Sequence, residues 1–342
     1  MKAAYVVETE KVEVKDIEIP AIADDEVLIE VKTVGVCGSD LCLFKGIHPF
    51  RSAPAILGHE IAGQIVKVGK DVKKFKVGDR VTVEPQIGCG ECELCKNDLI
   101  NLCTGGKKAP GTPGWYGTFV EYFNAPEKTL YKLNDEVSYE IGTLVEPLAV
   151  GVHTIDRITV KEKDYIAILG SGTIGLMTMV AAREAGYKNI ICTDTQDFNL
   201  EMAKKQGAAL TINPLKDDVV ALVKEFTGGR GVDVAIVAAD AAVLVDQASS
   251  ITRKRGEVGI VAMIPQQIPV HTYNFVFNEL TMFGAMTYET KDFVKASEMI
   301  NNGLDLTDFI TQKVSLDEAQ KGLDILNDKK ENVVKVIVEV NC

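Results

Sequence analysis

Four cysteines lie close together in one short segment, with the spacing C-x2-C-x2-C-x7-C: Cys89, Cys92, Cys95 and Cys103. Four thiolates can close a tetrahedron around Zn2+ and leave no position open for chemistry. Three cysteines within seven residues are too crowded for easy disulfide geometry, and an iron–sulfur cluster is the other option for four thiolates. The spacing therefore predicts a structural zinc site, where Gly88 and Gly90 let the backbone turn around the ion.

A second set of possible metal donors is spread along the chain. Cys37 stands in Cys-Gly-Ser-Asp, His59 and Glu60 follow Gly58, and Glu146 precedes a proline. Each is weak alone, because a lone cysteine is usually a small buried hydrophobe. Together they supply thiolate, imidazole and carboxylate, the mixed set used by catalytic zinc, which keeps one position open for water or substrate.

A glycine-rich turn of the form G-x-G-x-x-G is made by Gly170, Ser171, Gly172, Thr173, Ile174 and Gly175. An apolar run at 165–169 precedes it and a helical pattern at 176–184 follows. The first glycine permits the tight turn, the second lets the backbone approach a pyrophosphate, and the third allows close helix packing. The pyrophosphate is expected at the helix N-terminus, where free N–H groups and the dipole favour an anion.

Asp194 ends the next apolar run, 19 residues after Gly175. A carboxylate there accepts from the ribose 2′-OH and repels a 2′-phosphate. Asp197 adds negative charge, and no basic residue occurs from 194 to 202. We therefore predict NAD rather than NADP, with an ordinary solvent-facing aspartate as the alternative.

The secondary-structure elements that must position these residues show two different sequence patterns. Residues 1 to about 85 carry short alternating strands with Gly and Asp turns, which indicate a partly open barrel. From about 150, apolar strands at 165–169, 189–193, 232–237 and 257–263 alternate with helical patterns at 197–205, 217–226 and 241–253. This alternation predicts an α/β fold with a doubly wound parallel sheet, called a Rossmann domain. Helices are expected near 291–301 and 316–327, with a final strand at 332–340.

Composition bounds the class of protein. The chain has 342 residues, enough for two domains, and 46% of them are hydrophobic, as in a globular protein. The net charge of −12 argues against nucleic acid as a partner. No apolar run approaches the roughly 20 residues that span a bilayer, and the N-terminus lacks a signal core. Metal-type cysteine spacing then favours a reducing cytoplasm over an exported, disulfide-bonded protein.

These motifs together resemble the zinc-containing medium-chain dehydrogenases, closest to the sorbitol/polyol and threonine dehydrogenase branch. The resemblance implies a GroES-like catalytic domain at 1–150 with its zinc lobe at 88–104, an NAD-binding domain at 151–286, and a segment 287–342 that returns to the catalytic domain. It implies two zinc ions, one catalytic and one structural. Cys37 and His59 would be ligands of the catalytic ion, Glu60 a ligand or near-ligand, and Glu146 a ligand directly or through water.

The same resemblance assigns roles to neighbouring residues. Ser39 would be the first proton relay, with a helix N-cap as its alternative role. Asp40 would hold the imidazole of His59, with a turn cap as the alternative. Val261, Ala262 and Met263 would meet the nicotinamide end of NAD. The strand at 280–284 resembles the family's pairing strand and implies a homodimer or homotetramer.

Three positions depart from the family pattern. Many members carry a relay histidine where this chain has Cys42, and a thiol is a poor relay near neutral pH. Sorbitol dehydrogenases have an aromatic residue at Leu43 and an arginine at Thr287. We therefore doubt that sorbitol is the substrate. His48 could replace the relay, although an exposed loop histidine is the simpler interpretation.

The predicted function is transfer of a hydride between NAD and a small secondary alcohol or polyol, such as a sugar alcohol or cyclitol. Zinc would act as a Lewis acid on the alcohol. A threonine-type amino-alcohol dehydrogenase and a sugar-alcohol-phosphate dehydrogenase are the alternatives. Lys45 and Arg51, which follow Ser39 in sequence, could meet an anionic substrate, with solvated surface charge as the simpler interpretation. A zinc-free quinone reductase would lack both metal sets. A non-enzymatic NAD-binding protein on this fold is the remote alternative, which the zinc content per chain would separate.

Overall fold

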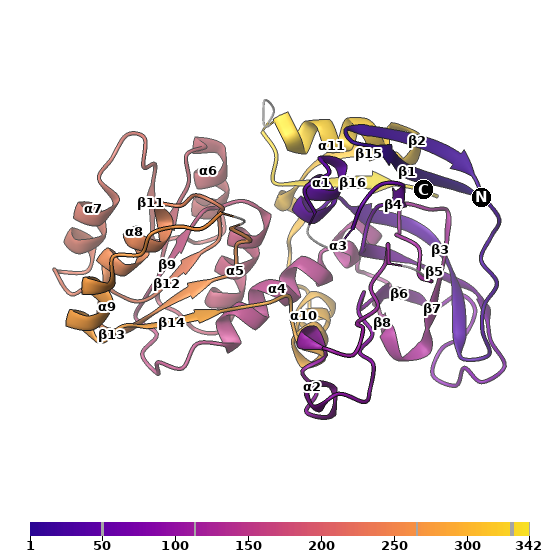
Figure 1. The fold of residues 1–342 in the computed structure, drawn as a ribbon, viewed down its shortest axis with the longest axis horizontal. Helices are drawn as coiled ribbons and strands as arrows, with labels where there is room; N and C mark the ends of the chain where they lie inside the picture. Colours follow the sequence, from indigo (N-terminus) through magenta and orange to yellow (C-terminus); the bar gives the residue numbers. More distant parts are fainter. Residues whose placement is uncertain (49–50, 113, 265, 329–331, 342) are drawn as a thin grey trace. The chain divides into compact units, whose positions relative to one another are not determined.

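The computed structural model describes residues 1–48, 51–112, 114–264, 266–328 and 332–341. The chain forms two compact units (Figure 1). The first combines Met1–Glu146 with Glu289–Cys342, and the second is Pro147–Tyr288. The C-terminal segment therefore shares a core with the N-terminal strands, and its yellow ribbon lies among the indigo elements of the first unit.

The first unit is built on mostly antiparallel strands, with one parallel pairing between two C-terminal strands at the edge of the sheet. Its seven-stranded sheet has the order β15-β16-β3-β5-β6-β8, and β7 also pairs with β3. These strands are β3 (Glu26–Gly35), β5 (Glu60–Val68), β6 (Arg80–Val83), β7 (Tyr122–Pro126), β8 (Leu130–Lys132), β15 (Ile310–Ser315) and β16 (Lys335–Glu339). A smaller sheet has the order β2-β1-β4, made of β1 (Lys2–Glu8), β2 (Lys11–Asp16) and β4 (Ala55–Ile56).

Strand register in this unit brings distant residues to one place. Gly35, at the end of β3, pairs with Glu60, at the start of β5, and on its other side with Ile337 of β16. The strand that precedes Cys37, the strand that follows His59 and the C-terminal strand therefore lie side by side.

Short helices complete the first unit. They are α1 (Gly38–Phe44), α2 (Glu93–Lys96), α3 (Tyr139–Thr143), α10 (Thr290–Asn301) and α11 (Ala319–Asp328), with 3-10 turns η1 (Ile100–Leu102), η2 (Glu127–Thr129), η3 (Thr307–Phe309) and η4 (Leu316–Glu318). The core cluster joins apolar side chains from β1, β3, β5 and α11, and includes Phe119 and Phe123. Helix α4 (Val145–Asp156) starts in this unit and continues into the second.

The second unit is a six-stranded sheet of order β11-β10-β9-β12-β13-β14, in which every pairing is parallel. Its strands are β9 (Tyr165–Leu169), β10 (Asn189–Thr193), β11 (Leu210–Ile212), β12 (Val232–Val237), β13 (Thr252–Ile260) and β14 (Thr281–Gly284). Its helices are α5 (Thr173–Glu184), α6 (Asp197–Lys205), α7 (Val219–Phe226), α8 (Leu244–Ile251) and α9 (Thr272–Asn278). The central strands are buried on both faces, which explains their unbroken apolar sequence.

The predicted fold class, a doubly wound α/β domain with a barrel-like β domain, is confirmed. One region was wrong in detail: the helix expected at 241–253 ends at Ile251, and a strand expected at 257–263 runs from Thr252 to Ile260. Thr252 pairs with Val232 of β12, and next to it Arg253 Nε donates to the buried carboxylate of Asp233 at 2.6 Å. Among the described residues, no helix is long and apolar enough to cross a membrane.

Candidate functional site

Cys37, His59 and Glu60 come together because β3 and β5 are antiparallel neighbours. Cys37 follows the end of β3 and is the N-cap of α1, while His59 and Glu60 stand at the start of β5. One donor atom from each residue lies within 4.8 Å of the other two. Thiolate, imidazole and carboxylate at this separation are suited to a zinc ion.

The charge around His59 favours a cation at this place. Burial alone would lower the pKa of His59, but the Cys37 thiolate, Asp40 and Glu146 raise it to about 10. The Nδ1 atom of His59 is buried and has no hydrogen-bond partner among the described residues. An imidazole in such negative surroundings, with an unpaired nitrogen, fits a metal-binding role.

The hydrogen bonds of Asp40 differ from the predicted one to the imidazole of His59. Its Oδ1 accepts the Gly58 N–H at 2.9 Å and its Oδ2 accepts the Cys37 N–H at 3.0 Å. The distance from Oδ1 to His59 Nδ1 is 3.8 Å, which is an ion-pair distance and too long for a hydrogen bond. Asp40 thus ties the two donor-bearing segments together through their backbones, and it acts on the imidazole through charge.

Two glutamate carboxylates, Glu60 and Glu146, lie in different surroundings near Cys37 and His59. Glu146 lies in the first turn of α4, is mostly buried, and is not among the donors gathered within 4.8 Å. Glu60 is fully buried and forms an ion pair with Lys335 Nζ at 2.7 Å. Sequence patterns did not indicate Lys335, because its partner is 275 residues away along the chain.

The residues after Cys37 occupy the short helix α1. Ser39 is half-buried in its first turn. Because the N-cap is Cys37, Ser39 does not have the alternative capping role. Leu43 is buried in the core of the first unit, so its side chain packs against the fold. His48 is half-buried, and its Nδ1 accepts the Arg51 N–H at 3.1 Å, so it is not a simple exposed loop histidine.

The four clustered cysteines bring their sulfur atoms close enough together to bind one metal ion. Their sulfur atoms lie within 4.8 Å of one another around α2 and η1, and all four are free thiols. The N–H groups of Cys92 and Cys95 donate to sulfur at 3.4 Å, and such backbone donors lower the pKa of Cys92 to about 5. The Gly90 N–H acts to lower the pKa of Cys95, but burial and the neighbouring thiols raise it to about 11. Thiolates rather than thiols bind zinc, so a bound cation would be needed to deprotonate all four cysteines.

Glycines make room for this cluster of sulfur atoms. A Cβ on Gly88 would lie 2.6 Å from Cys95 Sγ, and one on Gly105 would lie 2.4 Å from Cys89 Sγ. Gly90 adopts a φ of +76°, in the left-handed region. Gly105 was missed by sequence analysis, which considered only the glycines beside the first cysteine.

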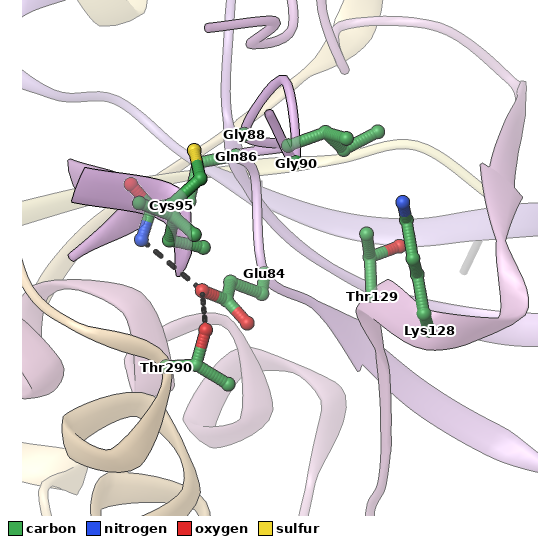
Figure 2. A pocket seen from close by; sticks show the side chains of 10 residues that line it. Glu84, Gln86, Gly88, Gly90, Cys95, Lys128, Thr129 and Thr290 are labelled. Atoms are coloured by element: carbon green, nitrogen blue, oxygen red, sulfur yellow. Dashed lines mark hydrogen bonds between the residues drawn. The ribbon is translucent and has the colours of Figure 1, made fainter. Parts of the chain in front are cut away.

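A cavity of about 220 Å³ adjoins the cysteine lobe (Figure 2). Its lining includes Glu84, Gln86, Cys95, Lys128, Thr129 and Thr290. The Glu84 carboxylate accepts hydrogen bonds from Gln86, Thr290 and the Tyr131 hydroxyl, and burial raises the pKa of Glu84. This cavity contains none of the predicted catalytic side chains, so it is not the substrate site.

The glycine turn of the second unit has the geometry of a dinucleotide site. Gly170 has a φ of +103°, and a Cβ there would meet Ala239 at 2.6 Å. Gly172 caps α5 and faces open space, which leaves its backbone accessible to a ligand. A Cβ on Gly175 would lie 1.8 Å from Gly170 O, so only glycine permits this helix–turn contact. Thr173 and Ile174 form the first turn of α5.

Asp194 follows β10 and stands beside this turn. Its Oδ2 accepts the Ser171 N–H and its Oδ1 accepts the Gln196 N–H, each at 2.8 Å. The carboxylate is therefore held at the mouth of the turn. Lys216 pairs with Asp197, a basic neighbour that local sequence did not indicate.

The predicted nicotinamide segment comes directly after β13. The N–H groups of Val261 and Ala262 both donate to Val237 O, at 3.0 and 3.2 Å, and Met263 is largely exposed. The segment therefore lies at the carboxyl ends of the central parallel strands, where ligands bind in open α/β sheets.

These features are typical of zinc-dependent oxidoreductases that use a dinucleotide. Comparison with known proteins agrees: residues 23–135 match the alcohol dehydrogenase GroES-like domain and residues 173–302 match the zinc-binding dehydrogenase domain. The chain belongs to the zinc-containing medium-chain alcohol dehydrogenase family. The predicted family and enzyme class are confirmed.

Similar proteins act on polyols and their phosphates. A sorbitol dehydrogenase of Bacillus subtilis is 37% identical over 347 residues, covering 100% of this chain and 98% of the relative. A D-arabitol-phosphate dehydrogenase of Enterococcus avium is 36% identical, covering 95% of this chain and 93% of the relative. A solved zinc-binding dehydrogenase of Sinorhizobium meliloti bound to NADP has a TM-score of 0.91 at 30% identity, covering 99% of this chain and 98% of that chain.

Proposed function

We propose that this chain oxidises a secondary alcohol of a polyol, or reduces the matching ketone, with NAD as the hydride carrier. The observation that carries the proposal is the Cys37–His59–Glu60 donor group, whose atoms lie within 4.8 Å of one another beside Ser39 on α1. Its mixed ligand types are those of catalytic zinc, not of a closed structural site.

The chain's own residues have distinct tasks in this reaction. Cys37 and His59 would hold the metal, and Glu60 and Glu146 would supply negative charge around it. Zinc, when bound, supplies Lewis-acid chemistry that makes an alcohol a stronger acid. Ser39 accepts the substrate's hydroxyl proton at Oγ and passes it toward solvent. Asp40 fixes the two donor-bearing segments by accepting the Cys37 and Gly58 N–H groups.

Dinucleotide binding is assigned to the second unit. The N–H groups at the start of α5 receive the pyrophosphate, and Asp194 accepts from the ribose 2′-OH. Val261, Ala262 and Met263 border the nicotinamide end. The carboxylate of Asp194 supports NAD over NADP, since a 2′-phosphate there would meet a like charge.

Substrate choice is narrowed by three side chains. Leu43 is buried in the core, and Thr287 offers no guanidinium, so the polyol contacts expected for sorbitol are reduced. Arg51 lies next to His48. Burial and the positive charge of Arg51 lower the pKa of His48, and His48 also interacts electrostatically with Asp40 and His59. This cation near the proposed metal centre favours a sugar-alcohol phosphate as the second candidate substrate.

The direct test is a panel of polyols, diols, threonine and sugar-alcohol phosphates, monitored by NADH absorbance, together with the zinc content per chain. We expect two zinc ions and turnover of a polyol or its phosphate. Cys37→Ala is expected to abolish turnover while the fold and the lobe zinc persist. Retained turnover in metal-depleted Cys37→Ala would contradict the proposal, and one zinc in the wild-type lobe alone would favour a non-enzymatic NAD-binding protein.

We also propose a homodimer or homotetramer in the cytoplasm. Strand β14 lies at the edge of the parallel sheet, and apolar residues on α9 beside it are exposed, which supports self-association. The seven described cysteines are free, which suits a reducing compartment, whereas Cys342 lies outside the described residues.

A further inference from the structure

Lys335 is a buried lysine at the start of the C-terminal strand β16. Only 2% of the residue is exposed, and its Nζ donates to Glu60 Oε1 at 2.8 Å, to Glu60 Oε2 at 2.7 Å and to Val36 O at 3.2 Å. An ammonium has three hydrogens, so this arrangement uses all of them. Lysine is almost never fully buried unless it is paired, and here both partners are specific.

The position of this ammonium relates it to the proposed metal centre. Val36 precedes Cys37, and Glu60 follows His59, so Lys335 bridges the two segments that carry the thiolate and the imidazole. A carboxylate oxygen of Glu60 also lies within 4.8 Å of the Cys37 and His59 donor atoms. The same carboxylate therefore stands between a cationic side chain and a place suited to a metal cation.

Gly35 keeps the carboxylate in this position. A Cβ on Gly35 would lie 1.8 Å from Glu60 Oε2, so the neighbouring strand is recessed where the carboxylate lies. Gly35 pairs with Glu60 on one side and with Ile337 of β16 on the other. Strands β3, β5 and β16 thus form a compartment that holds Glu60 against Lys335.

We propose that Lys335 is a positioning residue that withholds the Glu60 carboxylate from the metal at Cys37 and His59, so that a ligand position stays open for substrate. The inference rests on the metal centre of the proposed function. Lys335 engages both carboxylate oxygens, and its positive charge opposes a metal cation nearby. Without that charge, the buried carboxylate would lack a counter-ion and would bind the metal directly.

The test compares metal retention in wild-type holoenzyme and in Lys335→Met. Zinc content, the rate of loss of the catalytic ion to a chelator, and the absorption spectrum of the cobalt-substituted enzyme are measured beside kcat and KM. In Lys335→Met we expect chelator-driven loss to slow by about tenfold. We also expect the cobalt spectrum to gain an oxygen ligand, and kcat to fall while the ion remains bound. Lys335→Arg, which keeps the charge, should restore the wild-type rate of metal loss.

Two further variants make the result specific. Lys313→Met removes a half-exposed lysine from the adjacent strand β15 and should not change metal retention. Lys335→Met combined with Glu60→Gln should lose the slow release, because the effect acts through the carboxylate. If Lys335→Met does not fold, Lys335→Gln, which removes the charge but keeps an amide NH2 as a hydrogen-bond donor, is measured with the same expectation.

Metal loss from the folded Lys335 variant as fast as or faster than from wild type, with an unchanged cobalt spectrum, would overturn the role of Lys335. Lysine would then be only a structural counter-ion. A wild-type enzyme that binds a single zinc would instead defeat the proposed function itself. The two failures are therefore distinguishable.

Discussion

At the scale of single residues, we propose that Asp194 sets the preference of the second unit between NAD and NADP. Its carboxylate is held by the Ser171 and Gln196 N–H groups beside the glycine turn. We expect Asp194→Ser to raise the ratio of kcat/KM for NADP to that for NAD by about a hundredfold, because a like-charge contact costs several kcal/mol. Steady-state kinetics with both cofactors measure this ratio.

The matched control is Glu201→Ser, which removes an exposed carboxylate from α6 and should leave the ratio unchanged. An unchanged ratio in Asp194→Ser would show that this carboxylate does not face the 2′ position. Lys216 beside Asp197 would then be the residue to consider for 2′-phosphate binding.

Residues with a local signature could be predicted, and residues with a distant partner could not. The glycines of the dinucleotide turn and the four cysteines are recognisable because their spacing lies within one short segment. Lys335 stands among alternating valines and has no local mark, since its role depends on Glu60 across two strand pairings. Gly35 and Gly105 are likewise explained only by the side chains that approach them.

At the scale of elements, we propose that a zinc ion stabilises the cysteine lobe, since α2 and η1 are single short turns with little core of their own. We expect Cys92→Ala to lower the zinc content from two ions to one. We also expect the melting temperature to fall by about 3 °C or more, because a loss of about 2 kcal/mol shifts Tm by roughly this much in a chain of this size. Glu91→Ala, in the same loop, should change neither quantity. Normal stability in Cys92→Ala would argue against a structural zinc.

Glu84 connects α10 to the β strands of the first unit through a hydrogen bond from Thr290 (Figure 2). It also accepts a hydrogen bond from the Tyr131 hydroxyl. Burial raises the pKa of Glu84 above its usual 4.5, so the folded state holds its proton more tightly than the unfolded chain. The protein should therefore lose stability as pH rises from 4.5 through the raised pKa, with the full loss present above it.

We expect Glu84→Gln to remove this loss, because the amide can keep the same partners without a charge. In thermal melts its stability relative to wild type should increase from acidic to neutral pH. The control Glu91→Gln alters an exposed carboxylate within the cysteine lobe and should show no such trend. If the difference in thermal stability between Glu84→Gln and wild type does not vary with pH, the raised pKa of Glu84 is contradicted.

The ends of helices and strands could likewise be predicted where the local sequence sets them, and not where a distant contact does. The strands β9, β10 and β12 begin and end at the predicted residues because short apolar runs between turns leave little freedom. The end of α8 could not be predicted, since no Gly or Pro separates the helix from Thr252 and Arg253. Their place in β13 depends on distant contacts: Thr252 pairs with Val232, and Asp233 accepts from Arg253 within the folded sheet.

At the scale of the whole molecule, the parallel sheet of the second unit has one edge that invites pairing. Strand β14 ends the sheet order, and Met282 on it is 45% exposed. On α9, Tyr273 and Phe277 stack with centroids 5.1 Å apart, and both are largely exposed with Val276. An open strand edge beside an exposed apolar helix is unusual in a monomer and is typical of a surface that a second copy covers.

We expect the wild-type protein to have the mass of a dimer or tetramer in light scattering, and Met282→Lys to shift it to a monomer. A lysine on an edge strand opposes strand-to-strand pairing, because its charge would be buried in the new interface. Leu215→Lys is the matched control: Leu215 is also exposed in the second unit but lies away from β14 in sequence and outside the sheet. It should keep the wild-type mass. If Met282→Lys remains oligomeric while folding normally, association uses another surface and β14 is only a sheet edge.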